Sequence, residues 1–126
     1  MILVDASVWV DHLRAGDRTL ASLLDGGMVL AHPFVIGELA LGHLRQRELV
    51  LGTLRDLPQA CLATDREVLH FIYGNALFGK GIGYVDAHLL AAVQLTADAA
   101  LWTQDRRLHD VAEQLGVAMQ RRLLGS

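Results

Sequence analysis

The sequence begins Met1-Ile2-Leu3-Val4-Asp5-Ala6-Ser7, and this stretch decides how the rest of the chain is interpreted. Its apolar run, Ile2 to Val4, has no polar alternation, which is typical of a strand buried on both faces of a parallel sheet. Asp5 ends that run with a charge. Open α/β sheets bind ligands outside the carboxyl ends of their strands, so Asp5 stands where such proteins place their chemistry. The competing interpretation is that Asp5 only caps the next helix.

Further apolar runs and amphipathic segments alternate along the chain. The runs predict strands at residues 28–31, 58–63, 99–102 and 117–119. Helices are predicted at residues 8–13, from Asp17 to Gly26-Gly27, from Pro33 to about Leu44 or beyond, at 49–54, from the Thr64–Glu67 capping box through Ala76, at 84–95 and at 105–115. This alternation indicates an α/β fold, with residues 1–126 as a single domain whose parallel sheet has about five strands and helices on both faces.

The length and the cysteine count limit the class of protein. A chain of 126 residues can bury a core without disulfides or a structural metal. Cys61 is the only cysteine, so no internal disulfide can form, and the lack of a charged-then-apolar leader favours a cytoplasmic protein. No apolar run approaches the ~20 residues that cross a bilayer, so no membrane association is expected.

The charge and the apolar content both bear on partners. The formal net charge is −3, so a nucleic acid would have to be held locally, by metal ions or clustered arginines. Apolar residues make up 52% of the chain without its 12 glycines. The usual content of about 45–50% includes glycine, so the chain has an apolar surplus. Part of this surplus is expected to face a partner.

Glu38 stands in an apolar segment of the predicted third helix. It is the only charged residue from 32 to 42, and helical spacing gives it the same face as Phe34, Val35 and Leu41. A glutamate on a buried face is normally paired or bound to a metal, so the sequence favours a functional role over a surface charge or a core ion pair.

Two more acids stand at the ends of predicted elements. Asp86 falls in the first turn of the predicted helix 84–95, where backbone N–H groups favour an anion. Asp105 follows the strand at 99–102, at the same edge of the sheet as Asp5. Helix capping explains each position taken alone, but jointly they predict a convergent acidic pocket.

An acidic pocket of this composition implies divalent cations. Four like charges, from Asp5, Glu38, Asp86 and Asp105, repel one another unless cations offset them. Oxygen ligands suit Mg²⁺ or Mn²⁺, whereas zinc is disfavoured because Cys61 is alone and the histidines lack ligand spacing. Two such ions about 4 Å apart can activate a water and stabilise the leaving oxygen of a phosphodiester.

Four short motifs follow one another along nearly the whole chain. They are Asp5-Ala6-Ser7, Glu38-Leu39 followed by Gly42, Gly83-Tyr84-Val85-Asp86-Ala87 with Leu89-Leu90-Ala91-Ala92, and Leu101-Trp102-Thr103-Gln104-Asp105. In this order and spacing the set resembles the PIN-domain nucleases, specifically the VapC-type toxins.

The resemblance implies a Mg²⁺-dependent endoribonuclease that is the toxin of a type II toxin–antitoxin system. The acids that it assigns to the site are Asp5, Glu38, Asp86 and Asp105. It also implies a polar helper at Ser7 or Thr103, an RNA substrate, a homodimer and a cognate antitoxin protein. The last acid of the family varies most, so Asp105 is expected to ligate metal or only to position metal or water.

Other functions fit the sequence less well. Residues 74–81 nearly match a phosphate-binding P-loop, but Gly81 replaces the required hydroxyl residue and the segment ends a helix. A receiver-like signalling domain needs a phosphoacceptor Asp after the third strand, where residues 61–64 offer none. An Asp-nucleophile phosphatase needs an acid where Ser7 stands. A catalytically inactive protein-binding module stays open, although retention of all four acids argues against it.

Several conspicuous side chains receive ordinary interpretations. Trp9 and Trp102 flank apolar runs and are expected in the core. Arg106 and Arg107 either grip RNA phosphates or are exposed helix charges. His88 is expected to be a surface or packing residue of its helix.

Overall fold

A computed structural model describes residues 1–120, so the last six residues of the predicted domain lie outside the described part. The described part is an α/β structure with three strands and seven helices. The strands are β1 (Ile2–Val4), β2 (Val29–Leu30) and β3 (Ala100–Trp102). The helices are α1 (Ala6–Ala15), α2 (Arg18–Asp25), α3 (Pro33–Ala40), α4 (Arg47–Asp56), α5 (Asp65–Gly74), α6 (Tyr84–Leu95) and α7 (Arg106–Gln114).

The sheet is parallel, with the order β2-β1-β3. Its central strand pairs Leu3 with Leu30 on one side and with Leu101 on the other. The predicted outer strands are present as single parallel bridges, Ala31 to Gln59 and Leu101 to Ala118. The parallel α/β architecture is therefore confirmed, and five segments line up in the sheet although the outer two are minimal.

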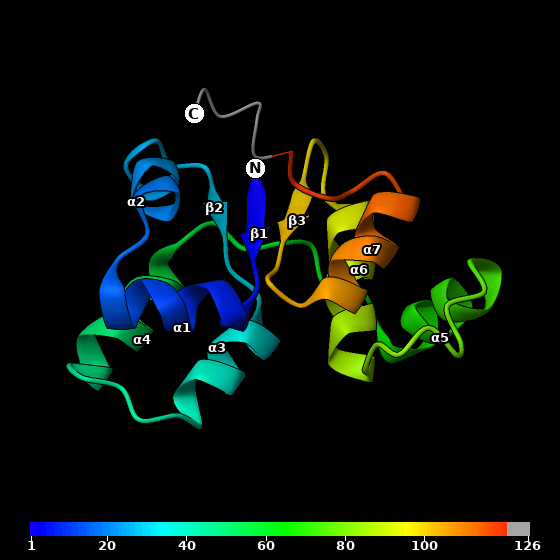
Figure 1. Ribbon diagram of the computed structural model, residues 1–126. Coiled ribbons are helices and arrows are strands. Elements are labelled where there is room, and N and C mark those ends of the chain that lie inside the picture. Colours follow the sequence, from blue (N-terminus) through cyan, green and yellow to red (C-terminus); the bar gives the residue numbers. More distant parts are fainter. Residues whose placement is uncertain (121–126) are drawn as a thin grey trace.

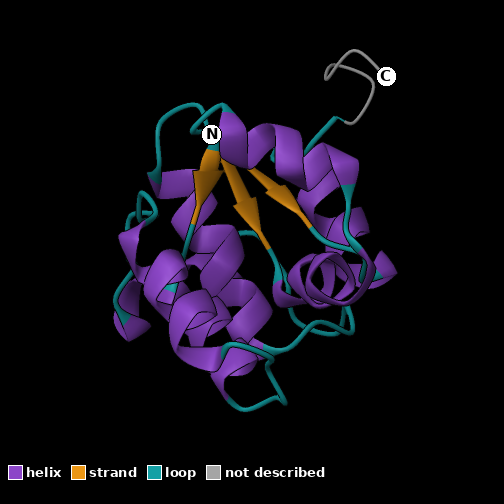
Figure 2. Ribbon diagram, turned by 90° about the vertical axis from the view of Figure 1, so that its left-hand side faces the viewer, coloured by secondary structure: helices purple, strands orange, loops and turns teal. Residues whose placement is uncertain are grey.

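The chain switches direction across the sheet after its third segment. From β1 it moves outward to β2 and then to Gln59, and it returns to the other side of β1 to form β3. Since crossovers between parallel strands are right-handed, this reversal puts the two groups of helices on opposite faces. Figure 1 shows α1 to α4 on one side of the strands and α5 to α7 on the other. Figure 2 shows the three arrows pointing the same way, so their carboxyl ends lie at one edge.

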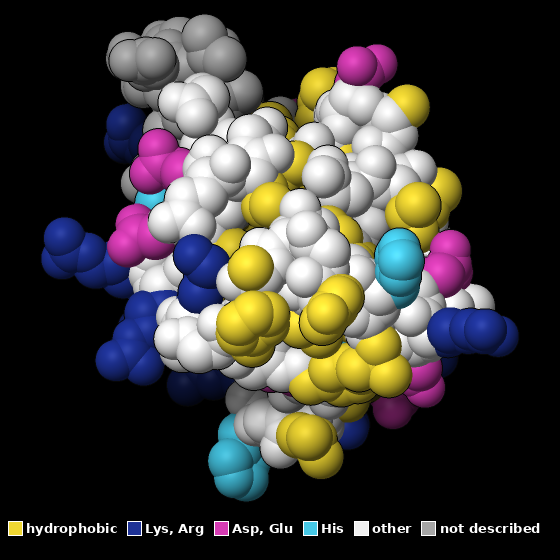
Figure 3. All heavy atoms as spheres, turned by 90° about the vertical axis from the view of Figure 1, so that its right-hand side faces the viewer, with side chains coloured by type: hydrophobic (Ala, Val, Ile, Leu, Met, Phe, Trp, Pro, Cys, Tyr) yellow, Lys and Arg dark blue, Asp and Glu magenta, His cyan; other side chains and the backbone are white. Residues whose placement is uncertain are grey.

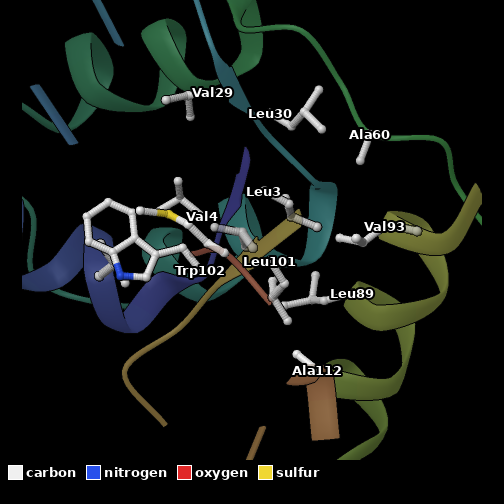
Figure 4. Close-up of a cluster of buried hydrophobic side chains, with 14 of the residues drawn as sticks. Leu3, Val4, Val29, Leu30, Ala60, Leu89, Val93, Leu101, Trp102 and Ala112 are labelled. Carbon is white, nitrogen blue, oxygen red and sulfur yellow. The ribbon is translucent and has the colours of Figure 1, made fainter. Parts of the chain in front are cut away.

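The core covers both faces of the sheet, where α1 to α4 pack on one face and α6 and α7 pack on the other. Leu3 and Leu101 have no exposed surface, and Figure 4 shows Leu89 and Val93 of α6 reaching toward them. Helix α6 is buried at every position from 87 to 93, which explains its near-continuous apolar sequence. Trp9 and Trp102 are also buried in this core, as predicted. In residues 1–120, none of the helices has the length and hydropathy that a membrane span requires.

Two helices end earlier than their sequence patterns predict. Helix α3 ends at Ala40 and not near Leu44, because the guanidinium of Arg47 donates to the carbonyl oxygen of Ala40 at 2.6 Å and caps the helix. Helix α5 opens on the predicted Thr64–Glu67 capping box but ends at Gly74, two residues early. There Asn75 caps the helix. The shortened α3 bears directly on the site.

Candidate active site

Asp5 follows β1 directly and is 8% exposed. Its Oδ1 accepts from the backbone N–H of Ala6 at 2.8 Å, so the side chain does cap α1. Its Oδ2 accepts from the hydroxyl of Thr103 at 2.7 Å and from that of Ser7 at 3.1 Å. The capping interpretation is therefore confirmed, and the second oxygen faces the polar side chains of the sheet edge, where a role in the chemistry stays a prediction.

The hydroxyls of Ser7 and Thr103 connect Asp5 to the loop after β3. The Ser7 Oγ accepts from the backbone N–H of Gln104 at 3.1 Å, and the Thr103 Oγ1 accepts from that of Asp105 at 3.0 Å. Each hydroxyl thus donates a hydrogen bond to Asp5 and accepts one from the backbone of the loop. The sequence suggested one helper or the other, and the structure brings both to the same carboxylate oxygen.

Asp86 lies half-buried in the first turn of α6. Its Oδ2 accepts from the backbone N–H of Gly83 at 3.0 Å. Burial raises the pKa of Asp86 most, this hydrogen bond opposes the rise, and the negative charges of Asp5 and Asp105 add to it. Asp86 therefore belongs electrostatically to one group with the two acids at the strand ends.

Asp105 is exposed at the start of α7. Its Oδ1 accepts from the backbone N–H of Leu108 at 3.0 Å, which is a helix-capping contact. Its own backbone N–H is held by Thr103, so its main chain is tied to the same network as Asp5.

Glu38 is exposed, and the expectation that it lies on a buried face was wrong. Helix α3 buries Val35 but turns Glu38 outward together with Leu41, which follows the shortened helix and is 91% exposed. The pKa of Glu38 is nevertheless raised, first by partial desolvation and then by the negative charges of Asp5 and Asp86. Glu38 therefore lies close enough to Asp5 and Asp86 for their charges to act on it.

The four acids lack compensating charge within residues 1–120. None of them forms an ion pair with Lys, Arg or His in this part of the chain. The Oδ1 of Asp86, the Oδ2 of Asp105 and both oxygens of Glu38 accept no hydrogen bond from the described residues. Such free carboxylate oxygens fit a hard divalent cation. However, no three His, Cys, Asp or Glu side chains in residues 1–120 form a ready-made metal site.

Arg107 rests on the loop that leads into α6. A Cβ added at Gly81, whose φ is +79°, would lie 2.8 Å from the Cδ of Arg107. The side chain thus spans from the start of α7 to the glycine-rich segment before Asp86. Glycine leaves room for this contact and also permits the left-handed backbone.

The sequence did not single out a pair of aromatic rings near the acids. His88 is 4% exposed with its Nε2 3.1 Å from Asp65 Oδ1, so it is a packing residue as predicted. The rings of Phe34 and Tyr84 both pack edge-on against it. The only sequence signal was that Phe34 and Tyr84 stand close to Glu38 and Asp86 along the chain. Aromatic residues at such helical positions are normally interpreted as packing residues.

Comparison with known proteins gives one family and one kind of relative. The family model described as PIN domain matches residues 2–114. The chain is 48% identical over 119 residues to "Ribonuclease VapC32" of Mycobacterium tuberculosis, in both strain CDC 1551 / Oshkosh and strain ATCC 25618 / H37Rv. This similarity covers 94% of the present chain and 96% of each relative. No solved structure matches the chain.

Proposed function

The chain belongs to the PIN-domain family, and we propose from this membership that it is a metal-dependent endoribonuclease, the toxin of a type II toxin–antitoxin system. The name of its relatives, Ribonuclease VapC32, supports the activity, and the similarity extends over nearly their whole length. The observation that carries the proposal is the group of uncompensated acids around Asp5 at the carboxyl edge of the sheet. That edge includes the point where the strand order reverses, which is where open α/β sheets bind ligands.

Mg²⁺ or Mn²⁺ would be held by Asp5 and Asp86, with Glu38 and Asp105 as further ligands, directly or through water. When bound, such ions lower the pKa of a water and stabilise the oxygen that leaves the RNA phosphodiester. The raised pKa values of Asp86 and Glu38 support this assignment, since a cation removes the repulsion that raises them.

The chain itself contributes orientation. The hydroxyls of Ser7 and Thr103 hold the buried carboxylate of Asp5 in one direction. The N–H of Gly83 does the same for Asp86 and leaves the second oxygen of that carboxylate available. Ser7 and Thr103 are therefore positioning residues in this proposal, because they act on the site through Asp5.

The proposal is tested by digesting total cellular RNA with the purified protein and mapping the cut ends. We expect discrete cuts with Mg²⁺, none with EDTA, and none from an Asp5→Asn variant that remains folded at the assay temperature. Absence of any cleavage across Mg²⁺ and Mn²⁺ concentrations would favour the rival function, an inactive protein-binding module.

We also propose an antitoxin partner that lies in the groove bordered by α1, α3 and α4. This groove has a volume of about 640 Å³, and its apolar lining includes Val10, Leu13 and Val50. Glu38 belongs to the same lining, so an apolar segment bound there can direct an Arg or Lys toward the acids. Such a cation competes with the metal, so inhibition should weaken as Mg²⁺ rises.

A second surface supports the proposal of a homodimer. Figure 3 shows hydrophobic side chains gathered on the side of the molecule where α5 lies. Those exposed on α5 and next to it are Leu62, Leu69, Tyr73, Phe78 and Leu95. Large exposed apolar patches usually mark interaction sites. We further propose that residues 1–126 act as one domain. We place this domain in the cytoplasm, because thiols stay reduced there and the single cysteine of the chain has no internal partner.

A further inference from the structure

Two aromatic side chains are partly exposed next to the acidic group. Phe34 of α3 is 38% exposed and Tyr84 of α6 is 45% exposed. Each packs edge-on against the ring of His88, with ring centroids 4.7 Å apart in both pairs. His88 itself is buried. The three rings form one cluster that joins α3 to α6.

The cluster is rigid because polar contacts hold its buried rings. Asp65 Oδ1 lies 3.1 Å from the Nε2 of His88 and also accepts from the hydroxyl of Tyr84 at 3.1 Å. On the other side, the buried ring of His32 packs against Phe34, and its Nδ1 accepts from the backbone N–H of Phe34 at 3.0 Å. The exposed rings therefore lose little freedom when a ligand packs on them.

Both rings lie within about one helical turn of the acids. Phe34 precedes Glu38 by four residues on α3, which puts the two side chains on the same face of the helix. Tyr84 opens α6 directly after Gly83, whose N–H binds the carboxylate of Asp86 at 3.0 Å. Since the charge of Asp86 also acts on Glu38, each ring lies next to an element end that holds one of the acids.

We propose that Phe34 and Tyr84, held in place by His88, bind one unpaired base of the RNA strand next to the phosphodiester that is cut. This proposal rests on the proposed ribonuclease function and adds to it the two side chains that bind a base beside the cut. Proteins that read single-stranded RNA stack such bases on aromatic side chains. Stacking on one ring changes affinity by roughly 5- to 150-fold per base, so the pair is strong enough to select the site of cleavage.

The test uses 2-aminopurine, a base whose fluorescence falls on stacking, placed in turn at each position of a short single-stranded RNA. Binding is measured with saturating Asp5→Asn protein, which leaves the RNA intact. We expect quenching at one position, lost on adding Phe34→Leu or Tyr84→Leu and kept with Tyr84→Phe. Met28→Leu is the control, because Met28 is 41% exposed just before β2 and therefore lies at the edge of the sheet opposite to the acids.

Cleavage of RNAs that lack one base gives the second readout. Removing the base that the rings bind should slow cleavage by the parent about tenfold and leave cleavage by the Phe34→Leu variant unchanged. Quenching that persists in both leucine variants, or that occurs at no position, overturns the proposal. The melting temperature of each variant is measured first, and if only one variant is folded, its result decides. Ring-dependent quenching without cleavage by the parent would refute the ribonuclease function and retain the base site.

Discussion

Asp5 caps α1 with one carboxylate oxygen and accepts from Thr103 with the other. Its position after a buried apolar run was predictable, because a charge at the end of such a strand must lie at the edge of the sheet. Its contact with Thr103 was not, since the two residues are 98 positions apart and only the pairing of β1 with β3 brings them together. Local pattern thus identifies the acid, whereas the strand order supplies the groups that orient it.

Thr103→Val should lower RNA cleavage by about 10- to 100-fold, the usual effect of removing a group that orients a metal ligand. Valine keeps the shape of the side chain but leaves Asp5 Oδ2 and the N–H of Asp105 without the hydroxyl. Thr103→Ser should restore most of the activity. Thr53→Val is the control, because the Thr53 hydroxyl binds only its own helix, at Leu49. A Thr103→Val variant with the cleavage rate of the parent would remove Thr103 from the site.

Asp86→Asn should raise the melting temperature by a few degrees at pH 7 in EDTA while abolishing cleavage. Folding raises the pKa of Asp86, so its ionised form costs stability above that pKa and the cost disappears as the pH falls through it. Asparagine removes the charge and can still accept from Gly83. In thermal melts, the difference between variant and parent should therefore shrink as the pH falls through the raised pKa and vanish below the ordinary value of 3.8. A lower melting temperature of the variant at pH 7 would indicate a structural carboxylate instead.

Glu38→Gln should also raise the melting temperature, but by less than Asp86→Asn does. Because Glu38 is exposed, solvent screens its repulsion from Asp5 and Asp86, and the gain in melting temperature should be smaller than for Asp86→Asn. The sequence placed this charge on a buried face because helical spacing cannot tell an apolar face that is covered from one that is open. Thermal melts of both variants in EDTA compare the two effects; an equal or larger gain for Glu38→Gln would contradict the exposed placement.

At the scale of elements, the sequence predicted which segments are helices better than where they end. The start of α5 was predictable because its capping box is local, with Thr64 and Glu67 three residues apart. The end of α3 was not, because the cap comes from Arg47, seven residues beyond Ala40. Helix periodicity continues past such caps, so the pattern overestimates helix length wherever a later side chain closes the last turn.

Gly81→Ala and Gly16→Ala separate backbone strain from a specific contact. Both glycines have a positive φ, +79° and +80°, so each alanine should destabilise the fold by roughly 1 kcal/mol. Only at Gly81 would the new Cβ displace a side chain, that of Arg107, beside the loop that holds Asp86. We therefore expect similar losses in chemical denaturation but reduced RNA cleavage for Gly81→Ala alone. Equal cleavage by both variants would show that the contact of Arg107 with Gly81 does not support the site.

At the scale of the whole molecule, the apolar surplus of the sequence is distributed over two exposed places. The sequence indicated that a partner surface exists but not where, because α5 carries its exposed Leu69 and Tyr73 in a pattern that also suits packing. Only the arrangement of helices leaves that face open (Figure 3). The groove beside Glu38 likewise depends on how α1, α3 and α4 meet.

Leu69→Glu should convert a homodimer into a monomer on size-exclusion chromatography with light scattering. A charge in the centre of an apolar interface loses its water and finds no partner. Leu49→Glu is the matched control, since Leu49 on α4 is 64% exposed and Leu69 on α5 is 60% exposed. If Leu69→Glu stays dimeric, or if Leu49→Glu alone is monomeric, the dimer does not use the α5 face.

The central claim is that the acids around Asp5 cleave RNA with the help of a divalent cation. Its most direct test is a Mg²⁺ titration of the cleavage of one short single-stranded RNA by the parent protein and by Asp5→Asn. The parent should be silent in EDTA and cleave faster as Mg²⁺ rises to saturation, while the variant stays silent throughout and remains folded at the assay temperature. Cleavage that persists in EDTA, or that survives in the Asp5→Asn variant at the rate of the parent, would contradict the claim.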